Sequence, residues 1–205
     1  MSRPKLSDAL RTAKVLFERP ALEAAIARIA DELRAAYADG EVPVQLTVMN
    51  GAMPFASQLA FALGERGLDL EFDYLHATRY RGETHGADLV WKHRPETPLQ
   101  GRKVLLVDDI LDEGHTLLEI RHWCEAQGAA EVRIAVLTRK LHDRCVAGIH
   151  ADHVGVELPD AFVFGYGMDY YEQGRNLPAV YALGDEGPAL PSRDPGPALP
   201  FPDTP

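Results

Sequence analysis

The segment from residue 103 to residue 137 constrains the fold more than any other part of this sequence. KVLLV (103–107) is a short, mostly apolar run, which is typical of a strand buried on both faces of a parallel sheet. TLLEIRHWCEAQG (116–128) places its apolar residues on one helical face and ends on Gly128, and EVRIAVL (131–137) follows as a second strand. Strand, helix and strand within 35 residues predict a βαβ crossover, so we expect a sheet that is at least partly parallel.

Hydrophobic patterns place further elements on both sides of this unit. They predict helices over 21–37 and 54–67, strands over 44–49 and 68–77, and short β-like pieces over 153–159 and 161–171. The stretch 78–100 is polar, contains glycines and prolines, and has no clear period. Two interpretations of this stretch stay open: a lid that becomes ordered on ligand binding, or a solvent-exposed β-hairpin.

Composition bounds the class of protein. The chain has 205 residues, of which 46% are hydrophobic and 25% are charged, which predicts one globular domain over residues 1–183. Seven prolines follow Gly184, so we expect residues 184–205 to form a flexible tail. Two cysteines cannot supply a disulfide framework, and no apolar run reaches the roughly 18 residues of a membrane span. We therefore expect a soluble, cytoplasmic protein.

The net charge narrows the choice of partners. Lys and Arg total 21 against 31 Asp and Glu, which gives a formal charge of −10. An acidic chain is poorly suited to forming a broad surface for nucleic acid or an anionic membrane, so we expect neither as a partner. A small anionic ligand needs only a few local donors and is compatible with this charge.

Four acidic residues lie within six positions directly after the strand at 103–107: Asp108, Asp109, Asp112 and Glu113. The carboxyl ends of strands are where parallel α/β sheets bind ligands. Carboxylates this close repel one another and raise each other's pKa unless a divalent cation, sugar hydroxyls or backbone N–H groups compensate. These residues therefore predict a ligand site. The structural alternative is a set of solvated loop acids in which Asp112 caps the following helix.

The run EGHT (113–116) leads from these acids into the helix at 116–128. Gly114 permits a tight turn, so we expect several backbone N–H groups to point at one spot with the helix dipole behind them, which suits a phosphate. The nucleotide-binding patterns G-x-x-x-x-G-K-[ST] and G-x-G-x-x-G are both absent from the chain. A phosphate site beside acids suited to sugar hydroxyls fits a phosphorylated sugar.

VLLVDDILDEGHT (104–116) resembles the 5-phosphoribosyl-1-pyrophosphate (PRPP) motif of type I phosphoribosyltransferases. That motif is an apolar strand, two acids, two apolar residues, Asp, any residue, Gly, any residue and Thr. VMNGAMPF (48–55) resembles the short pyrophosphate loop of the same family. RKLHDR (139–144) and the segment 153–183 are similar to the 6-oxopurine branch, the hypoxanthine-guanine phosphoribosyltransferases. The resemblance spans roughly residues 15–183.

The resemblance implies a fold and an activity. The fold is an α/β type, a twisted, mainly parallel sheet flanked by helices, with a small hood built from the N-terminal piece and residues from about 150 to 183. The activity is transfer of the 5-phosphoribosyl group from PRPP to N9 of hypoxanthine or guanine with release of pyrophosphate, a step of purine salvage. Mg²⁺ is the implied cofactor, PRPP and a purine base are the implied partners, and a homodimer or homotetramer is the implied assembly.

The resemblance also implies roles on the sugar and phosphate side. Asp108 and Asp109 would bind the ribose hydroxyls of PRPP, directly or through Mg²⁺, and Asp169 would ligate a Mg²⁺ ion that also holds pyrophosphate. The residues that would bind the 5′-phosphate are Glu113, Gly114, His115 and Thr116. The residues that would bind the pyrophosphate are Asn50, Gly51 and Arg175. Tyr80 matches the aromatic position of the family's closing lid.

On the purine side, the resemblance makes Asp112 the general base, near N7 of the purine. The residues that would bind the purine are Lys140, Phe162, Val163 and Asp169. Lys140 would donate a hydrogen bond to the 6-oxo group, which distinguishes hypoxanthine and guanine from adenine. Phe162 would stack on the ring, and Val163 would bond it through its main chain.

Asn50 and His115 depart from the family pattern, because many relatives carry a basic residue at the first position and lysine at the second. Both changes lower the positive charge near the phosphates, so we expect a weaker affinity for PRPP. Two alternatives stay open at this point: a type I transferase for xanthine, adenine or orotate, and a regulator of the same fold that senses nucleotides. The resemblance of residues 153–183 counts against the first, and the charge of −10 counts against an RNA-binding form of the second.

Overall fold

The chain forms four helices and nine strands within residues 3–79 and 89–184, which are the residues that the computed structural model describes. In chain order the elements are α1 (Leu6–Thr12), β1 (Lys14–Phe17), α2 (Arg19–Ala36), β2 (Val44–Val48), α3 (Met53–Glu65), β3 (Glu71–Arg79), β4 (Leu89–His93), β5 (Lys103–Leu111), α4 (His115–Ala126), β6 (Glu131–Lys140), β7 (His153–Leu158), β8 (Val163–Phe164) and β9 (Val180–Ala182). Tyr80, the predicted lid residue, and the predicted tail after residue 184 lie outside these ranges. No helix in the described ranges is long and apolar enough to cross a membrane.

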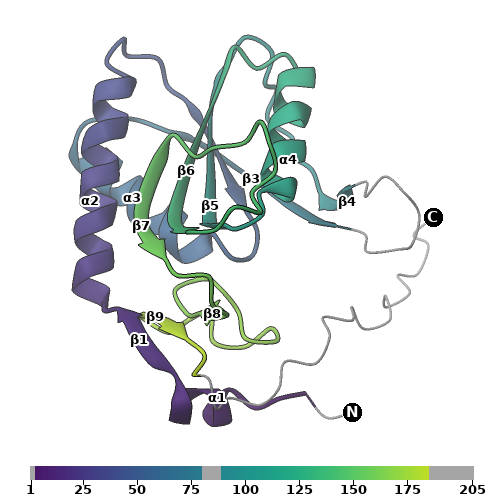
Figure 1. Ribbon diagram of the computed structural model, residues 1–205. Helices are drawn as coiled ribbons and strands as arrows, with labels where there is room; N and C mark the ends of the chain where they lie inside the picture. The colour runs from purple at the N-terminus through teal and green to yellow at the C-terminus, as the bar shows by residue number, and fades with distance from the viewer. Residues whose placement is uncertain (1–2, 80–88, 185–205) are drawn as a thin grey trace, which may run out of the picture.

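Six strands form the central sheet in the order β4-β3-β2-β5-β6-β7 (Figure 1). Neighbouring strands are parallel except for β3 and β4. β5, α4 and β6 form the crossover predicted at 103–137, and Lys103 lies in register with Glu131. The prediction of an α/β fold with a mainly parallel sheet flanked by helices is therefore confirmed.

Apolar side chains cover both faces of this sheet, because successive residues of a strand point to opposite sides. On one face, Leu105 of β5 belongs to a buried cluster with Leu22 of α2 and Leu59 of α3. On the other face, Leu106 belongs to a buried cluster with Ile120 of α4. Figure 1 shows the result, with α2 and α3 on one side of the sheet and α4 on the other. Burial on both faces explains why this strand contains an unbroken apolar run.

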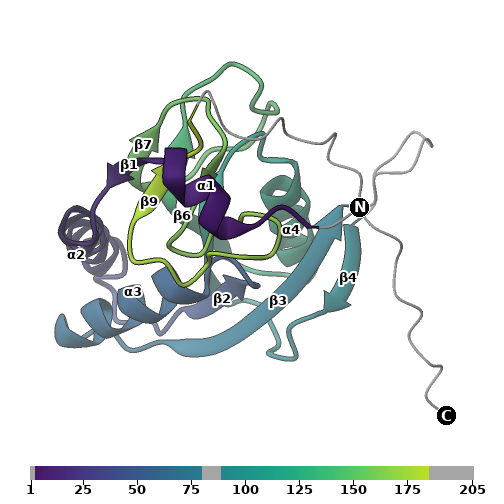
Figure 2. The same ribbon diagram turned by 90° about the horizontal axis from the view of Figure 1, so that it is seen from below.

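β1, β9 and β8 form a small antiparallel sheet. α1 packs onto it, because Ala9 shares a buried cluster with Phe164 and Tyr170. The N-terminal piece and the strands after residue 162 therefore come together as a hood, which lies below the central sheet in Figure 1 and faces the viewer in Figure 2. The expected start of the hood at about residue 150 is wrong, because β7 pairs with β6 and belongs to the central sheet. The sequence patterns did not predict α1 or β1, since elements of seven and four residues are too short to show a period.

The stretch 78–100 forms a β-hairpin in its described part, because β4 pairs antiparallel with β3. Trp91 of β4 contacts Trp123 of α4, with ring centroids 5.0 Å apart. The side chain of Asp73 on β3 accepts hydrogen bonds from two backbone N–H groups of the loop that follows β4. The hairpin interpretation is therefore correct on both sides of residues 80–88.

Candidate active site

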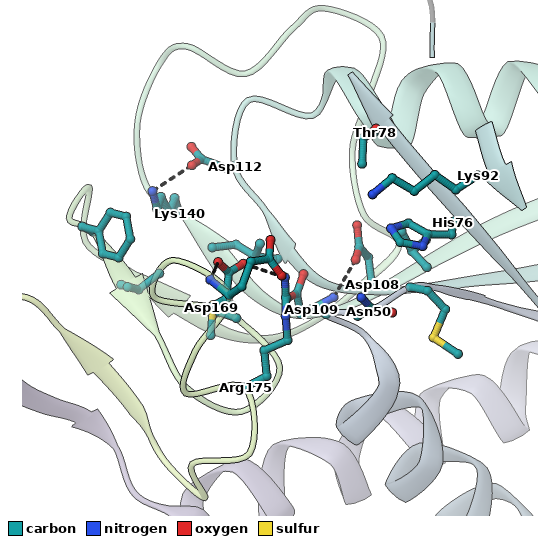
Figure 3. A pocket seen from close by; sticks show the side chains of 18 residues that line it. Asn50, His76, Thr78, Lys92, Asp108, Asp109, Asp112, Lys140, Asp169 and Arg175 are labelled. Carbon is teal, nitrogen blue, oxygen red and sulfur yellow. Dashed lines mark hydrogen bonds and ion pairs between the residues drawn. The ribbon is translucent and has the colours of Figure 1, made fainter. Parts of the chain in front are cut away.

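A cavity of about 490 Å³ is formed by the central sheet and the hood (Figure 3). Its walls come from the carboxyl ends of β2, β3, β5 and β6, from β4, and from the hood segment that includes β8. Ten residues with predicted roles line it: Asn50, Gly51, Asp108, Asp109, Asp112, Lys140, Phe162, Val163, Asp169 and Arg175. Residues far apart in the sequence thus meet at the carboxyl edge of the parallel strands, where ligand sites of such sheets lie.

Four residues with a predicted phosphate role lie outside the cavity lining, at the start of α4: Glu113, Gly114, His115 and Thr116. Gly114 adopts φ +80°, and a Cβ there would lie 2.6 Å from Ile149 Cγ2, so the tight turn requires glycine. α4 begins at His115 and Gly114 is its N-cap. Asp112 therefore does not cap the helix, and the structural alternative for this residue is wrong.

Asp108 and Asp109 are both buried at the end of β5. Burial raises the pKa of both carboxyl groups, and the negative charge of Asp109 raises the pKa of Asp108 further. The backbone N–H of Asp109 donates to Asp108 Oδ1 at 2.9 Å. Gly51 approaches this pair so closely that a Cβ there would lie 2.0 Å from Asp109 Oδ2. Two acids thus lie side by side in a place where a cation or donor groups from a ligand would stabilise their charge.

Asp112 lies in the same cavity and already has two donors. Lys140 Nζ donates to its Oδ2 at 2.7 Å, and His142 Nε2 lies 2.7 Å from its Oδ1. Burial would raise the pKa of Asp112, but the hydrogen bonds from Lys140 and His142, together with the charge of Lys140, outweigh it and lower the pKa. Lys140 reaches this position because β6 continues beyond residue 137, where the sequence pattern ended the strand.

Arg175 and Asp169 form an ion pair in the hood (Figure 3). Arg175 Nη2 lies 2.8 Å from Asp169 Oδ1, and its Nη1 donates to the carbonyl of Gly167 at 2.9 Å. Asp169 Oδ2 accepts the backbone N–H of Glu172 at 2.8 Å. The positive charge of Arg175 also lowers the pKa of Asp109, against the larger effect of burial. The residues predicted for pyrophosphate and Mg²⁺ therefore meet beside the acid pair.

Phe162 and Val163 line the cavity from the hood. Phe162 lies edge-on to Tyr170, with ring centroids 5.9 Å apart, and nearly parallel to Tyr171 at 6.3 Å. Val163 is buried in β8. An aromatic ring supported by other rings offers a firm apolar face to a flat ligand.

The chain is similar to known proteins over most of its length. The phosphoribosyl transferase domain model matches residues 12–173. The hypoxanthine-guanine phosphoribosyltransferase of Streptococcus pneumoniae (strain ATCC BAA-255 / R6) is 33% identical over 174 residues, which cover 84% of this chain and 94% of that protein. The chain belongs to the hypoxanthine-guanine phosphoribosyltransferase family.

Two further members of this family are similar to the chain. The hypoxanthine-guanine phosphoribosyltransferase of Bacillus subtilis (strain 168) is 34% identical over 171 residues, which cover 83% of this chain and 92% of that protein. The crystal structure of a hypoxanthine phosphoribosyltransferase from Staphylococcus aureus matches with a TM-score of 0.78 and 26% identity, over 87% of this chain and 96% of that one. The family resemblance inferred from the motif at 104–116 is therefore confirmed.

Five residues of the site with polar or charged side chains have no role predicted from the family pattern: His76, Thr78, Lys92 and Glu172, which line the cavity, and His142. Burial and the charge of Lys92 lower the pKa of His76. Side chains at every second position of a strand share one face, so Phe72, Tyr74, His76 and Thr78 lie on the same face of β3. Extending the predicted alternation of this strand would therefore have indicated His76 and Thr78. No local pattern indicates Lys92, because the pairing of β4 with β3 places it.

Proposed function

We propose that this protein transfers the 5-phosphoribosyl group of PRPP to N9 of hypoxanthine or guanine and releases pyrophosphate, in purine salvage. The cavity supports this reaction because it holds two different acidic centres. Asp108 and Asp109 form an acid pair that suits the hydroxyls of a sugar. Asp112, held by Lys140, suits a purine that carries a 6-oxo group. This combination in one cavity is the observation that carries the proposal.

At the sugar end, Asp108 and Asp109 accept hydrogen bonds from the ribose hydroxyls. Burial raises the pKa of both acids, the charge of Asp109 raises that of Asp108 further, and arriving donors relieve both effects. As the bond between C1′ and pyrophosphate breaks, the ribose gains positive charge, which these carboxylates stabilise. The 5′-phosphate binds on the backbone of residues 113–116 at the N-terminus of α4.

The family typically uses Mg²⁺, and the acids of the cavity fit this ion. Mg²⁺ prefers oxygen ligands and takes only one or two protein carboxylates, completing its shell with water and substrate phosphates. Asp108, Asp109 and Asp169 are the carboxylates that would hold it. Within residues 3–79 and 89–184, no group of three or more His, Cys, Asp or Glu side chains could hold a metal ion on its own. Mg²⁺ would therefore also need oxygen ligands from water and from the substrate. When bound, Mg²⁺ would neutralise charge on PRPP and on the departing pyrophosphate.

Arg175 stabilises the departing pyrophosphate by exchanging Asp169 for a phosphate oxygen. Asn50 and Gly51 offer backbone groups to the pyrophosphate but no charged side chain. Lys92 of β4 lines the same cavity, and its side chain makes no hydrogen bond or ion pair with any other residue in the described ranges (Figure 3). Its charge is therefore available to a phosphate and compensates for the basic residue that is missing at Asn50.

At the purine end, Lys140 turns from Asp112 to the 6-oxo group and donates a hydrogen bond to it. Asp112 Oδ2 is then free to accept the proton that leaves N7 of the purine, while N9 forms the bond to C1′. Phe162 stacks on the ring, and Val163 bonds it through the main chain. An adenine would present an amino donor to Lys140, and one of the two donors would stay unpaired.

Steady-state kinetics with PRPP and Mg²⁺ test this function. The panel of bases comprises hypoxanthine, guanine, xanthine, adenine and orotate, and we expect the largest kcat/KM for hypoxanthine or guanine. A clear preference for xanthine, adenine or orotate would assign the protein to another type I transferase. Lack of turnover with every base would favour the nucleotide-sensing regulator.

We expect the protein to act in the cytoplasm as a homodimer or homotetramer, as the family resemblance implies. Exposed apolar side chains on α3 and β3 support self-association, since such patches mark interaction surfaces: Met53, Phe61, Phe72 and Tyr74. Phe61 is 74% exposed. Sedimentation should give the mass of a dimer or tetramer, and Phe61→Glu should reduce it. A wild-type protein that sediments as a monomer would contradict this expectation.

A further inference from the structure

His142 contacts Asp112 but does not line the cavity. Its Nε2 lies 2.7 Å from Asp112 Oδ1, and its side chain is only 3% exposed. Lys140 occupies the other carboxylate oxygen, Oδ2, also at 2.7 Å. A ligand in the cavity can therefore displace Lys140 without touching His142.

The tautomer of His142 follows from its second nitrogen. The backbone N–H of Arg144 donates to His142 Nδ1 at 3.1 Å. A ring nitrogen that accepts a hydrogen bond carries no proton, so the neutral imidazole holds its proton on Nε2. That proton points at Asp112 Oδ1 and makes a hydrogen bond strengthened by the charge of the acceptor. The backbone after His142 thus fixes both the tautomer and the orientation of the ring.

We infer that His142 is a positioning residue, which holds Asp112 in the orientation needed to take the purine proton. This inference rests on the proposed function. When Lys140 turns to the 6-oxo group, Asp112 loses one of its two donors and His142 is the donor that stays. Without His142, the carboxylate is free to rotate away from N7, and burial raises its pKa.

Other charged groups also lie around Asp112. Lys140 comes from β6, Arg144 comes from the loop after β6, and Glu113 follows in the chain. Arg144 is held by Asp160, after β7, through hydrogen bonds of 2.7 and 2.8 Å. Lys140 contacts the carboxylate at the oxygen that the histidine does not use. Substitution of the histidine alone therefore isolates its effect on Oδ1.

Three variants test the inference. His142→Leu removes the donor to Asp112, and His142→Gln restores one, because a glutamine Nε2 can reach the place of the histidine Nε2. His153→Leu is the matched control: His153 is 9% exposed and its Nδ1 lies 2.9 Å from Glu32 Oε2, at the start of β7 and away from the cavity. All three variants are assayed beside the wild type, whose own turnover tests the proposed function separately.

For His142→Leu we expect kcat to fall about tenfold, the lower end of the cost of losing an outer hydrogen-bond partner of a functional ligand. KM for PRPP should stay within about twofold of the wild type, since the sugar end is untouched. The acid limb of the kcat profile should move to higher pH, because Asp112 must be ionised and its pKa rises. His142→Gln should restore kcat and the limb, and His153→Leu should change neither. Wild-type kcat and pH profile in His142→Leu, or an equal fall in kcat for His153→Leu, would overturn the inference.

The tautomer gives a second test on the wild-type protein. Nitrogen-15 NMR of the imidazole rings at neutral pH should show a proton on Nε2 of His142 and none on Nδ1. The signals are assigned by their loss in His142→Gln. A proton on Nδ1 would turn a bare Nε2 toward the carboxylate and would overturn the inference without any measurement of activity.

Discussion

The acid pair Asp108 and Asp109 and the single acid Asp112 lie within five positions of the chain and line one cavity. Burial raises the pKa of both members of the pair, and for Asp108 the charge of its neighbour adds to the effect. At Asp112 the same effect of burial is outweighed by Lys140 and His142, and the pKa falls. The residue type is the same in each case, so the difference comes from the groups that the folded chain places around each carboxylate.

This difference fits the separate roles proposed for the two centres. A carboxylate that is ionised and oriented in the free protein is ready to take a proton. A buried pair with raised pKa values is ready to receive sugar hydroxyls or a cation, because either would stabilise its charge. Groups whose surroundings push their pKa values apart mark such divisions of labour in active sites.

Asp112→Asn breaks the purine end of the comparison and has the largest expected effect. The side-chain volume is kept but the base is lost, so kcat should fall by about 10²-fold or more. Asp152→Asn is the matched control. Asp152 lies just before β7 and outside the cavity lining, and its Oδ2 accepts the backbone N–H of Ile134 at 2.7 Å. Circular dichroism checks that both variants fold. Near-normal kcat in folded Asp112→Asn would remove this residue from the mechanism.

Gly51→Ala breaks the sugar end. A Cβ at residue 51 would lie 2.0 Å from Asp109 Oδ2, so the carboxylate must move. Displacement by about 1 Å at a reacting centre costs up to about a hundredfold, so kcat/KM for PRPP should fall by about ten- to a hundredfold. Gly64→Ala is the control, because Gly64 lies in α3 with no atom within 4 Å of an added Cβ. It should leave kcat/KM unchanged and raise Tm, since helical glycine costs roughly 0.5–1 kcal/mol relative to alanine. Equal kinetics for the two variants would contradict the contact with Asp109.

Lys140→Met sharpens the comparison from the donor side. The ratio of kcat/KM for hypoxanthine over adenine should fall by about tenfold or more, because the donor that rejects the amino group is gone. The acid limb of kcat/KM, which reports the free enzyme, should also move to higher pH, since Asp112 loses a hydrogen bond that lowers its pKa. Lys103→Met, at the start of β5, is the control, because Lys103 lies 3.1 Å from Glu41 and outside the cavity lining. An unchanged ratio in Lys140→Met would leave the lysine without a role in base choice.

Thermal unfolding without ligand carries the smallest expected effect, and its sign differs between the two centres. Asp108→Asn removes a buried like charge and should raise Tm at neutral pH by a few degrees, because ~1 kcal/mol corresponds to about 2–4 °C for a domain of this size. Asp112→Asn removes a charge that Lys140 and His142 stabilise, and should lower Tm. Changes of the same sign in both variants would contradict the comparison.

The dependence of Tm on pH follows the same signs. An unfolded Asp has a pKa near 3.9, and Asp108 and Asp109 have higher values when folded. Folding therefore takes up protons between these values, and the pair makes stability fall as the pH rises through that window. Asp112 has a lowered pKa, so its contribution is present above the unfolded value and is lost as the pH falls through the folded one. Scans of Tm against pH test both signs. Asp108→Asn should weaken the fall of Tm with rising pH, and Asp112→Asn should weaken the fall of Tm with falling pH.

Local pattern predicted the parts of the fold whose contacts are local. The strand, helix and strand at 103–137 are confirmed, because apolar runs and a glycine exit mark them directly. Gly128 has φ +82° where the helix was expected to end. α1 was not predicted, since it is too short to show a period. The hairpin of β3 and β4 was one of two open interpretations, since it depends on a partner strand across residues 80–88.

The family resemblance indicated ten residues that line the cavity, but it did not predict how they pair. Lys140 and His142 lie 28 and 30 residues from Asp112, and nothing in the sequence around the acid indicates either contact. Parallel pairing of β5 with β6 brings Ile110 opposite Thr138 and so sets the ends of both strands side by side. These pairings lower the pKa of Asp112, which is why the residues that line the cavity could be predicted from the sequence and the opposite pKa directions could not.

Carboxyl carbon-13 NMR of the ligand-free protein, labelled at aspartate, tests the contrast between the two centres most directly. Asp112 should titrate below the ordinary range of aspartate, and the pair Asp108 and Asp109 should titrate above it, with the signals assigned from the Asn variants. Asp112→Asn should remove the low titration only. Titration of Asp112 at or above the ordinary value, or of both paired acids at or below it, would contradict the division between an ionised base and a buried pair that awaits its ligand.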